Sequence, residues 1–179
     1  LQALEHPATA MGNVGAGTGA TVGKLCGMER ASKTGIGCYA MALGELQVAA
    51  VVVVNALGDI FDPVNGTKIA GLMNEDRTAF GDSCEELWKL GCPQNLFTGN
   101  TTIGAVITNG QFNKAQMNKI ASMTRNAYAR CINPVGTMAD GDSIYAASIG
   151  DVKADINVTG TLAAHVMERA IVKAVESAR

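Results

Sequence analysis

The tetrapeptide GNTT at residues 99–102 places two threonines between a flexible Gly-Asn pair and a run of β-branched and small residues. If the peptide bond between Asn100 and Thr101 is cut, Thr101 becomes an amino-terminal residue with a nucleophilic hydroxyl. Its own α-amine, whose reference pKa is about 8, can then serve as the base. This chemistry predicts acyl transfer through an ester on Thr101. If the bond stays intact, the same residues are only a polar start to a strand, the interpretation that local sequence physics favours.

Two other motifs contain residue types that are common in binding sites. The stretch GAGTGA at residues 15–20 satisfies the dinucleotide-binding fingerprint, but no apolar strand precedes it, and Leu25 replaces the Ser or Thr that a phosphate loop needs after Lys24. We therefore expect no nucleotide there, and the glycines indicate close approach of the backbone to another segment or to a ligand. Taken alone, Lys24 is typical of a solvated surface lysine, and the DGD triplet at residues 140–142 is typical of a turn.

Residue types that bind metals are few and scattered. The chain has two histidines, His6 and His165, and five cysteines without a C-x-x-C pair. An odd number of cysteines without ligand spacing is typical of buried reduced thiols, and it argues against a zinc site or a disulfide framework. We therefore expect no metal and no cofactor.

The segments around these motifs predict a layered fold, with helices or another sheet on each side of a central strand. Within residues 35–59, two strand-like runs are separated near Gly44, and the second is almost continuous in Val and Ala, which is typical of a strand buried on both faces. A polar and irregular excursion follows from Asp62 to Gly99, with helical potential only around residues 84–90. The remaining predicted elements are a strand at residues 101–108, a helix capped by Asn113 that ends before Pro134, a strand at 143–149 and a helix from about 161 to 177.

Composition limits the class of partner. The 179 residues suffice for one domain with a hydrophobic core. With 17% charged residues and a net charge of -2, there is no electrostatic basis for binding nucleic acid or an anionic membrane, so we expect a neutral substrate or partner. The longest apolar run, residues 48–54, is too short to span a bilayer, and the amino end does not resemble a signal sequence, which predicts a cytoplasmic protein.

Four motifs in a fixed order carry a resemblance to a known family. They are GNVGAGTGATVGK at residues 12–24, VVVVNALGD at 51–59, GNTTIGAVITN at 99–109 and DGDSIYAAS at 140–148. In this order they resemble the P1/S58 family of self-processing aminopeptidases and amidohydrolases, which includes D-aminopeptidase/esterases, β-peptidyl aminopeptidases and the nylon-oligomer hydrolase. The resemblance implies an α/β fold, the αββα sandwich of the D-aminopeptidase and ornithine acetyltransferase type, with an N-terminal-nucleophile mechanism.

The resemblance also implies roles for particular residues. Thr101 matches the nucleophile, and Lys24 matches an active-site lysine that contacts the nucleophile or shifts a neighbouring pKa. Asn55 matches an asparagine whose side-chain N–H donates to the tetrahedral oxyanion. Asp140 and Asp142 match an acidic pair near the nucleophile, and we expect them to share a hydrogen-bond network with Thr101 and Lys24 that keeps the lysine charged. Threonine combined with Asp-Gly-Asp favours the nylon-hydrolase-like branch.

The expected organisation is a single domain over residues 1–179 that is the carboxy-terminal part of a longer precursor. Self-cleavage between Asn100 and Thr101 would leave residues 1–100 as the end of an α-chain and residues 101–179 as a β-chain. Family precursors carry further strands and an active-site tyrosine upstream of the glycine motif, and this chain begins at Leu1, too late to contain them. We expect that upstream segment to be a partner of this chain, and the assembly to be a homo-oligomer, a tetramer or larger.

Three functions follow as hypotheses. The first is an autoprocessing amidohydrolase that acts on a small amide or peptide substrate, or on ω-amino-acid oligomers. The second is acyl transfer to an amine, as in the similarly folded ornithine acetyltransferases. The third is a catalytically silent oligomeric binding or shell protein that keeps the fold without cutting itself.

Overall fold

A four-stranded sheet organises the chain in the computed structural model, which describes residues 10–91 and 99–178. Its strands are β3 (Ile36–Leu43), β4 (Leu46–Val53), β7 (Ile103–Gly110) and β9 (Ser143–Val152), and they lie in the order β3-β4-β7-β9. The pairs β3/β4 and β4/β7 are antiparallel, whereas β7 and β9 are parallel. His6 and Cys92, which entered the metal argument, lie outside the described residues.

The β3–β4 hairpin forms where the sequence predicts it. Leu43 pairs with Leu46, so Gly44 and Glu45 make a two-residue turn. Gly44 has a φ of 59°, the left-handed conformation that such a turn requires and that glycine adopts without a steric penalty. The predicted break near Gly44 is confirmed.

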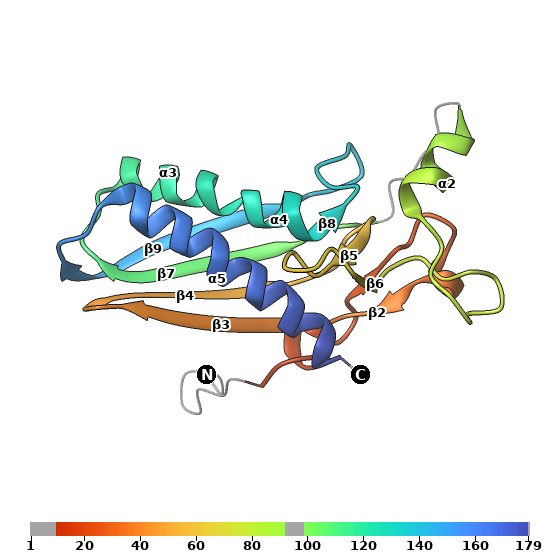
Figure 1. Ribbon diagram of the computed structural model, residues 1–179, viewed down its shortest axis with the longest axis horizontal. Coiled ribbons are helices and arrows are strands. Elements are labelled where there is room, and N and C mark those ends of the chain that lie inside the picture. Colours follow the sequence, from red (N-terminus) through yellow and green to blue (C-terminus); the bar gives the residue numbers. More distant parts are fainter. Residues whose placement is uncertain (1–9, 92–98, 179) are drawn as a thin grey trace.

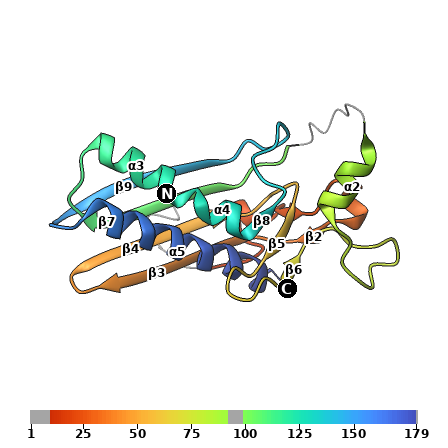
Figure 2. The ribbon, with the colours of Figure 1, turned by 45° about the horizontal axis from the view of Figure 1, so that its top comes forward.

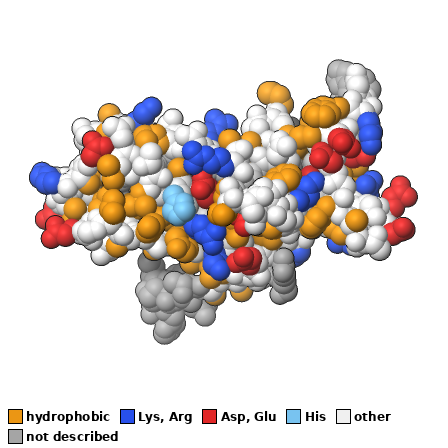
Figure 3. Space-filling model, in the orientation of Figure 1, with side chains coloured by type: hydrophobic (Ala, Val, Ile, Leu, Met, Phe, Trp, Pro, Cys, Tyr) orange, Lys and Arg blue, Asp and Glu red, His pale blue; other side chains and the backbone are white. Residues whose placement is uncertain are grey.

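Three helices cover one face of the sheet (Figures 1 and 2). Helix α5 (Ile156–Glu176) packs across β3 and β4, α3 (Lys114–Thr124) packs on β9, and α4 (Asn126–Cys131) continues from α3 and contacts α5. Charged side chains are scattered among hydrophobic ones over this helical face of the molecule (Figure 3). No helix within the described ranges combines the length and apolar character needed to cross a membrane.

The helix boundaries differ from the predicted ones in two places. Asn113 caps α3 as predicted, and the structure adds a capping box with Gln116. The helix is interrupted at Arg125 instead of continuing to Pro134. Helix α5 begins before the predicted start because the Asp155 side chain accepts from the backbone N–H groups of Asn157 and Val158. Helix α5 continues through Gly160. A Cβ at this position would lie 2.5 Å from the Met123 sulfur, so the glycine allows α3 to pack closely against α5.

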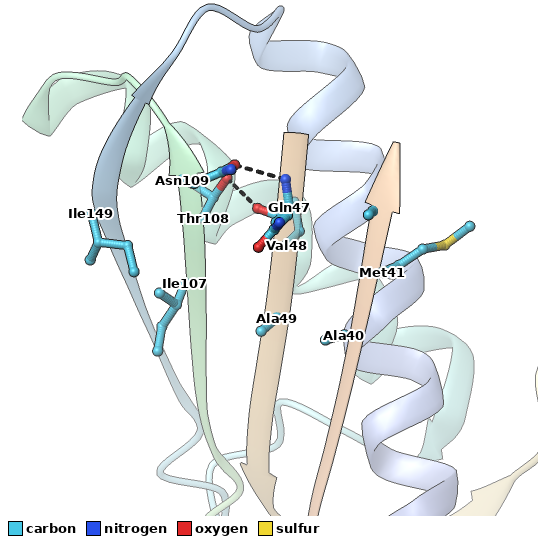
Figure 4. Close-up of a pocket in the computed structure, with 10 residues that line it drawn as sticks. Ala40, Met41, Gln47, Val48, Ala49, Ile107, Thr108, Asn109 and Ile149 are labelled. Carbon is cyan, nitrogen blue, oxygen red and sulfur yellow. Dashed lines mark hydrogen bonds between the residues drawn. The ribbon is translucent and has the colours of Figure 1, made fainter. Parts of the chain in front are cut away.

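The prediction that the Val-rich strand is buried on both faces is wrong for the described residues. Alternate β4 side chains, Leu46, Val48, Ala50 and Val52, are buried against the helices. Val51 on the other face is 37% exposed, because the helices cover only one side of the sheet. The uncovered face, which we call the open sheet face, is nevertheless apolar and includes Cys38, Ala40, Ala49, Val51, Ile103, Ala105, Ile107, Tyr145, Ala147 and Ile149. Ala40, Ala49, Ile107 and Ile149 line an open pocket of about 360 Å³ on this face. Figure 4 shows how these side chains lie on the neighbouring strands.

Smaller elements complete the fold. Strands β1 (Thr21–Val22) and β2 (Ser32–Lys33) form a two-stranded sheet, and β6 (Lys68–Ala70), β5 (Asp59–Phe61) and β8 (Ile132–Asn133) form a three-stranded one. The short helices are η1 (Gly15–Gly17), η2 (Met28–Arg30) and α2 (Ser83–Leu90), and α2 matches the predicted helical patch.

The buried carboxylate of Asp59 holds the polar excursion against this small sheet. It accepts hydrogen bonds from the Leu72 N–H, from the N–H and hydroxyl of Ser83, and from Lys68 Nζ at 2.7 Å. A carboxylate that is 1% exposed requires such complete pairing to be tolerated in the interior. The segment from Lys68 to Ser83 is therefore fixed to the first residue of β5.

Candidate active site

The sequence-predicted site residues come from four segments that meet at one edge of the main sheet. Asn55 follows β4, Thr101 precedes β7, and the Asp140–Asp142 triplet precedes β9. Parallel strands begin at the same edge, and an antiparallel neighbour ends there, so the order β4-β7-β9 brings these segments together. Lys24 reaches the same place from the segment after β1.

Thr101 lies beside the carbonyl of the residue before it. Its Oγ1 donates to the Asn100 carbonyl oxygen at 2.6 Å, and its N–H donates to the Asn55 carbonyl oxygen at 2.8 Å. The predicted strand start at Thr101 is wrong, because regular pairing begins only at Ile103. The threonine therefore sits in an irregular junction, with its hydroxyl next to the Asn100–Thr101 peptide bond.

Lys24 is partly buried and bonded to Asn55. Its Nζ donates to Asn55 Oδ1 at 2.8 Å and lies 3.4 Å from the Asn55 carbonyl oxygen, the same oxygen that accepts from the Thr101 N–H. Burial lowers the Lys24 pKa to about 8, and the nearby charge of Asp140 opposes this only in part. The interpretation of Lys24 as a solvated surface lysine is wrong, because its ammonium group is partly buried and bonded to Asn55. A pKa of about 8 still leaves the lysine mostly charged at neutral pH, as expected.

Close packing of Gly23 positions Lys24 at the site. Gly23 has a φ of 67°, and a Cβ on it would lie 1.9 Å from the Leu72 backbone nitrogen. The Gly23 N–H donates to the Gly58 carbonyl oxygen at 3.0 Å, and this hydrogen bond holds the segment against the residues that follow β4. The predicted close backbone approach is confirmed at Gly23 and Gly17, whereas Gly15 and Gly19 have no neighbour within 4 Å of a built Cβ.

Asn55 makes contacts on both sides of the junction. Its Oδ1 accepts from Lys24 and, at 3.3 Å, from the Thr21 N–H, while its Nδ2 donates to the Gly99 carbonyl oxygen at 2.9 Å. This donor therefore contacts the carbonyl of the residue before Asn100.

Asp140 and Asp142 flank the junction but have separate hydrogen-bond partners. Asp140 accepts from the Thr137 N–H at 3.0 Å and the Thr137 hydroxyl at 2.7 Å. Asp142 Oδ1 accepts from the Thr102 N–H at 2.8 Å, and burial raises the pKa of its carboxyl group. The shared network that we expected is not formed among the described residues. Asp142 holds the backbone next to Thr101, and Asp140 influences Lys24 through its charge.

Several polar atoms at the junction are buried without a partner among the described residues. They are both amide atoms of Asn100, the hydroxyl of Thr102 and Oδ2 of Asp142. Asn100 is 1% exposed, so its unpaired amide carries a desolvation cost of about 1 to 3 kcal/mol. The junction between Asn100 and Thr101 thus leaves several polar atoms unpaired among the described residues.

Sequence reasoning missed Gly141 as a contact of the junction. Its N–H donates to the Asn100 carbonyl oxygen at 2.9 Å, and a Cβ on it would lie 2.8 Å from Thr101 Oγ1. The only signal in the sequence was its place between the two aspartates, which a turn explains equally well.

The described residues contain no group of three or more His, Cys, Asp or Glu side chains that could hold a metal ion. The four cysteines in the described ranges, Cys26, Cys38, Cys84 and Cys131, are free thiols, and Cys131 is fully buried. Independence from metals and cofactors remains a prediction about the whole protein.

Solved structures with similar architecture identify the fold. A β-aminopeptidase from Burkholderia sp. matches 94% of this chain with a TM-score of 0.61 at 20% identity, and the chain covers 47% of it. The L-aminopeptidase D-Ala-esterase/amidase of Ochrobactrum anthropi, described as a variant of the N-terminal-nucleophile hydrolase fold, matches 94% with a TM-score of 0.64 at 17% identity and is covered to 45%. The expected fold class is confirmed. Within the described residues, this chain supplies the main sheet and the helical layer on one face of it.

Sequence comparison then identifies the family. The family model "Peptidase family S58" matches residues 1–179, and the chain belongs to this family. A 6-aminohexanoate-oligomer endohydrolase from Agromyces sp. (strain KY5R) is 30% identical over 91% of this chain, which covers 50% of that relative. An uncharacterised aminopeptidase of Mycobacterium leprae is 34% identical over 81% of this chain and is covered to 39%. The chain therefore spans about half or less of the length of these relatives.

Proposed function

We propose that this chain is the catalytic part of an autoprocessing N-terminal-nucleophile amidohydrolase that takes the acyl group of an amide substrate onto Thr101. The observation that carries the proposal is the 2.6 Å contact between Thr101 Oγ1 and the carbonyl oxygen of Asn100. It brings a hydroxyl nucleophile beside the one peptide bond whose cleavage would convert Thr101 into an amino-terminal residue.

Self-cleavage needs a base other than the threonine amine, because the Thr101 nitrogen is still part of a peptide bond. Lys24 is the basic side chain bonded to Asn55, next to the Thr101 N–H, and its pKa of about 8 leaves a neutral fraction at physiological pH. A neutral lysine can accept the hydroxyl proton and return it to the departing nitrogen. We assign this role to Lys24.

Turnover uses the group that self-cleavage releases. The new α-amine of Thr101 acts as the base for its own hydroxyl, and a charged Lys24 nearby favours the neutral form of that amine. Once the segment ending at Asn100 moves away, Asn55 Nδ2 loses its Gly99 acceptor and becomes free to donate to a substrate oxyanion. This assigns Asn55 to turnover.

The open sheet face supports the proposed organisation as part of a longer precursor. Apolar surface of this extent needs a cover, and relatives of about twice this length match the chain. We assign the cover to the upstream segment, which would form the second half of the sandwich and contribute to the substrate pocket. Neutral amides, short peptides or ω-amino-acid oligomers are the proposed substrates, a homo-oligomer is the proposed assembly and the cytoplasm the proposed location.

The proposal is tested on the full-length precursor. Intact-protein mass spectrometry after incubation should find a carboxy-terminal fragment whose first residue is Thr101, and the cut protein should hydrolyse a 6-aminohexanoate oligomer or a peptide amide. A protein that hydrolyses these amides while its Asn100–Thr101 bond remains intact would contradict the mechanism.

The pH dependence of self-cleavage should report Lys24. Because the neutral lysine is the base, the rate should increase about tenfold per pH unit below its pKa and level off above about 8. Lys24→Met should cut slowly at every pH, and Lys24→Arg should do the same because its guanidinium stays charged. Lys33→Met, which removes an exposed lysine from β2, is the control and should keep the wild-type profile. A normal profile in Lys24→Met would remove the lysine from the mechanism.

The two aspartates should differ in their effect on that profile. Asp140 raises the Lys24 pKa, so Asp140→Asn should lower it further and shift the rise in self-cleavage rate to lower pH. Asp142→Asn should reduce the rate without shifting the profile, because Asp142 holds the Thr102 N–H and is not a cause of the Lys24 shift. Rate-against-pH curves of both variants check this, and equal shifts in the two would refute the distinction.

A further inference from the structure

The carbonyl that self-cleavage attacks already has a backbone donor. The Asn100 oxygen accepts from the Gly141 N–H at 2.9 Å, in addition to the Thr101 hydroxyl at 2.6 Å. The side-chain N–H of Asn55, which the sequence suggests for this kind of role, donates to Gly99 instead. Among the described residues, Gly141 is thus the one group besides the nucleophile itself that hydrogen-bonds this oxygen.

The position of Gly141 follows from the register of the sheet. Ile103 pairs with Ser143 in the parallel β7/β9 ladder, and the isolated bridge between Asn100 and Asp140 extends this pairing beyond the ends of the strands. The Ser143 N–H donates to the Thr102 carbonyl at 3.1 Å, and the Gly141 N–H repeats that contact two residues earlier. The donor is therefore held by backbone pairing on both sides, without depending on a side-chain rotamer.

Glycine at position 141 also leaves room for the nucleophile. A Cβ there would lie 2.8 Å from Thr101 Oγ1, closer than real Cβ contacts allow. The absence of a side chain thus permits the hydroxyl and the Gly141 N–H to approach the same carbonyl group.

We propose that the backbone N–H of Gly141 is the oxyanion donor for self-cleavage, an inference that rests on the proposed function. Attack forms the bond between Thr101 Oγ1 and the Asn100 carbonyl carbon and moves the π electron pair onto the oxygen that Gly141 contacts. The hydroxyl proton passes through Lys24 to the Thr101 nitrogen as the C–N bond breaks, which leaves an ester. Water then hydrolyses this ester to the Asn100 carboxyl group and a free Thr101 hydroxyl. A fixed donor aimed at the developing negative charge lowers the barrier of the first step.

Removing only this N–H tests the assignment. Replacement of Gly141 by glycolic acid converts the amide N–H to an ester oxygen and leaves the side chains unchanged. Cys131 is a natural ligation point, so an expressed thioester of the precursor ending at Arg130 can be joined to a synthetic peptide that begins at Cys131. Refolding starts the reaction, and mass spectrometry follows the fragment beginning at Thr101. The matched control replaces Ser143 by its α-hydroxy analogue, which removes the donor to Thr102 in the same ladder.

The ester at position 141 should slow self-cleavage by about 100- to 1,000-fold relative to the all-amide protein, and the ester at 143 by no more than about threefold. In uncut Thr101→Ala proteins the two esters should lower the melting temperature similarly, since each loses one backbone hydrogen bond. Equal cleavage rates at positions 141 and 143 would overturn the assignment of Gly141 and leave the proposed function standing. An all-amide protein that refolds but never cuts would overturn both.

Discussion

Thr101→Ala should leave the precursor whole and abolish amide hydrolysis. The substitution removes the hydroxyl that lies 2.6 Å from the Asn100 carbonyl oxygen, so neither self-cleavage nor acyl transfer has a nucleophile. Loss of a nucleophile that acts with its base as a unit lowers kcat by about 10⁴- to 10⁶-fold. Intact mass of the precursor and the initial rate of amide hydrolysis measure the two effects on the same sample.

The neighbouring threonine provides the matched control. The Thr102 hydroxyl is buried beside the Asp142 carboxylate, and Thr102→Val removes this hydroxyl while it keeps the shape of the side chain and leaves the Thr101 hydroxyl in place. This variant should still cut before Thr101. Thr101→Ser should also cut, since it keeps the hydroxyl. If Thr101→Ala matured normally, the nucleophile would have been misassigned.

Asn55→Ala should lower kcat of the cut enzyme by about 100- to 1,000-fold with little change in KM, because a donor to the oxyanion stabilises the transition state and not bound substrate. Self-cleavage should be less affected than turnover, since in the uncut chain the Asn55 N–H contacts Gly99 and not the carbonyl under attack. The comparison of both rates in one variant distinguishes the two steps. The oxyanion assignment would have to be abandoned if kcat stayed within about threefold of the wild type.

Asn109→Ala is the control for a general loss of stability. The Asn109 side chain accepts from the Gln47 N–H at 2.7 Å and donates to the Glu45 carbonyl at 2.9 Å, near the β3–β4 turn. Its contact to Gln47 is visible in Figure 4. The variant should melt at a lower temperature but keep kcat, because these contacts lie at the end of the sheet away from Thr101. A parallel loss of kcat in both variants would show that Asn55→Ala acts through stability.

Features set by local chemistry were predictable from the sequence. The Gly44 turn, the Asn113 cap and the helical patch at α2 each depend on residues within a few positions of one another. The ordered motifs predicted the family, and strand order explains why residues as distant as Asn55, Thr101 and Asp142 meet at one sheet edge. Residue type and spacing were sufficient for the turn, the cap and the helical patch because short-range sterics and hydrogen bonds determine them.

Only the tertiary structure decided which atoms meet and how the groups titrate. The β7/β9 register brings the Gly141 N–H within hydrogen-bond distance of the Asn100 carbonyl oxygen. Close packing of Gly23 against the residues after β4 buries Lys24 enough to lower its pKa to about 8. The aspartates expected to share a network have separate partners, and β4 is covered on one face only. These outcomes depend on distances and on burial between segments far apart in the chain. Sequence alone determined which chemical groups are available, and packing determined the contact and the dielectric environment of each.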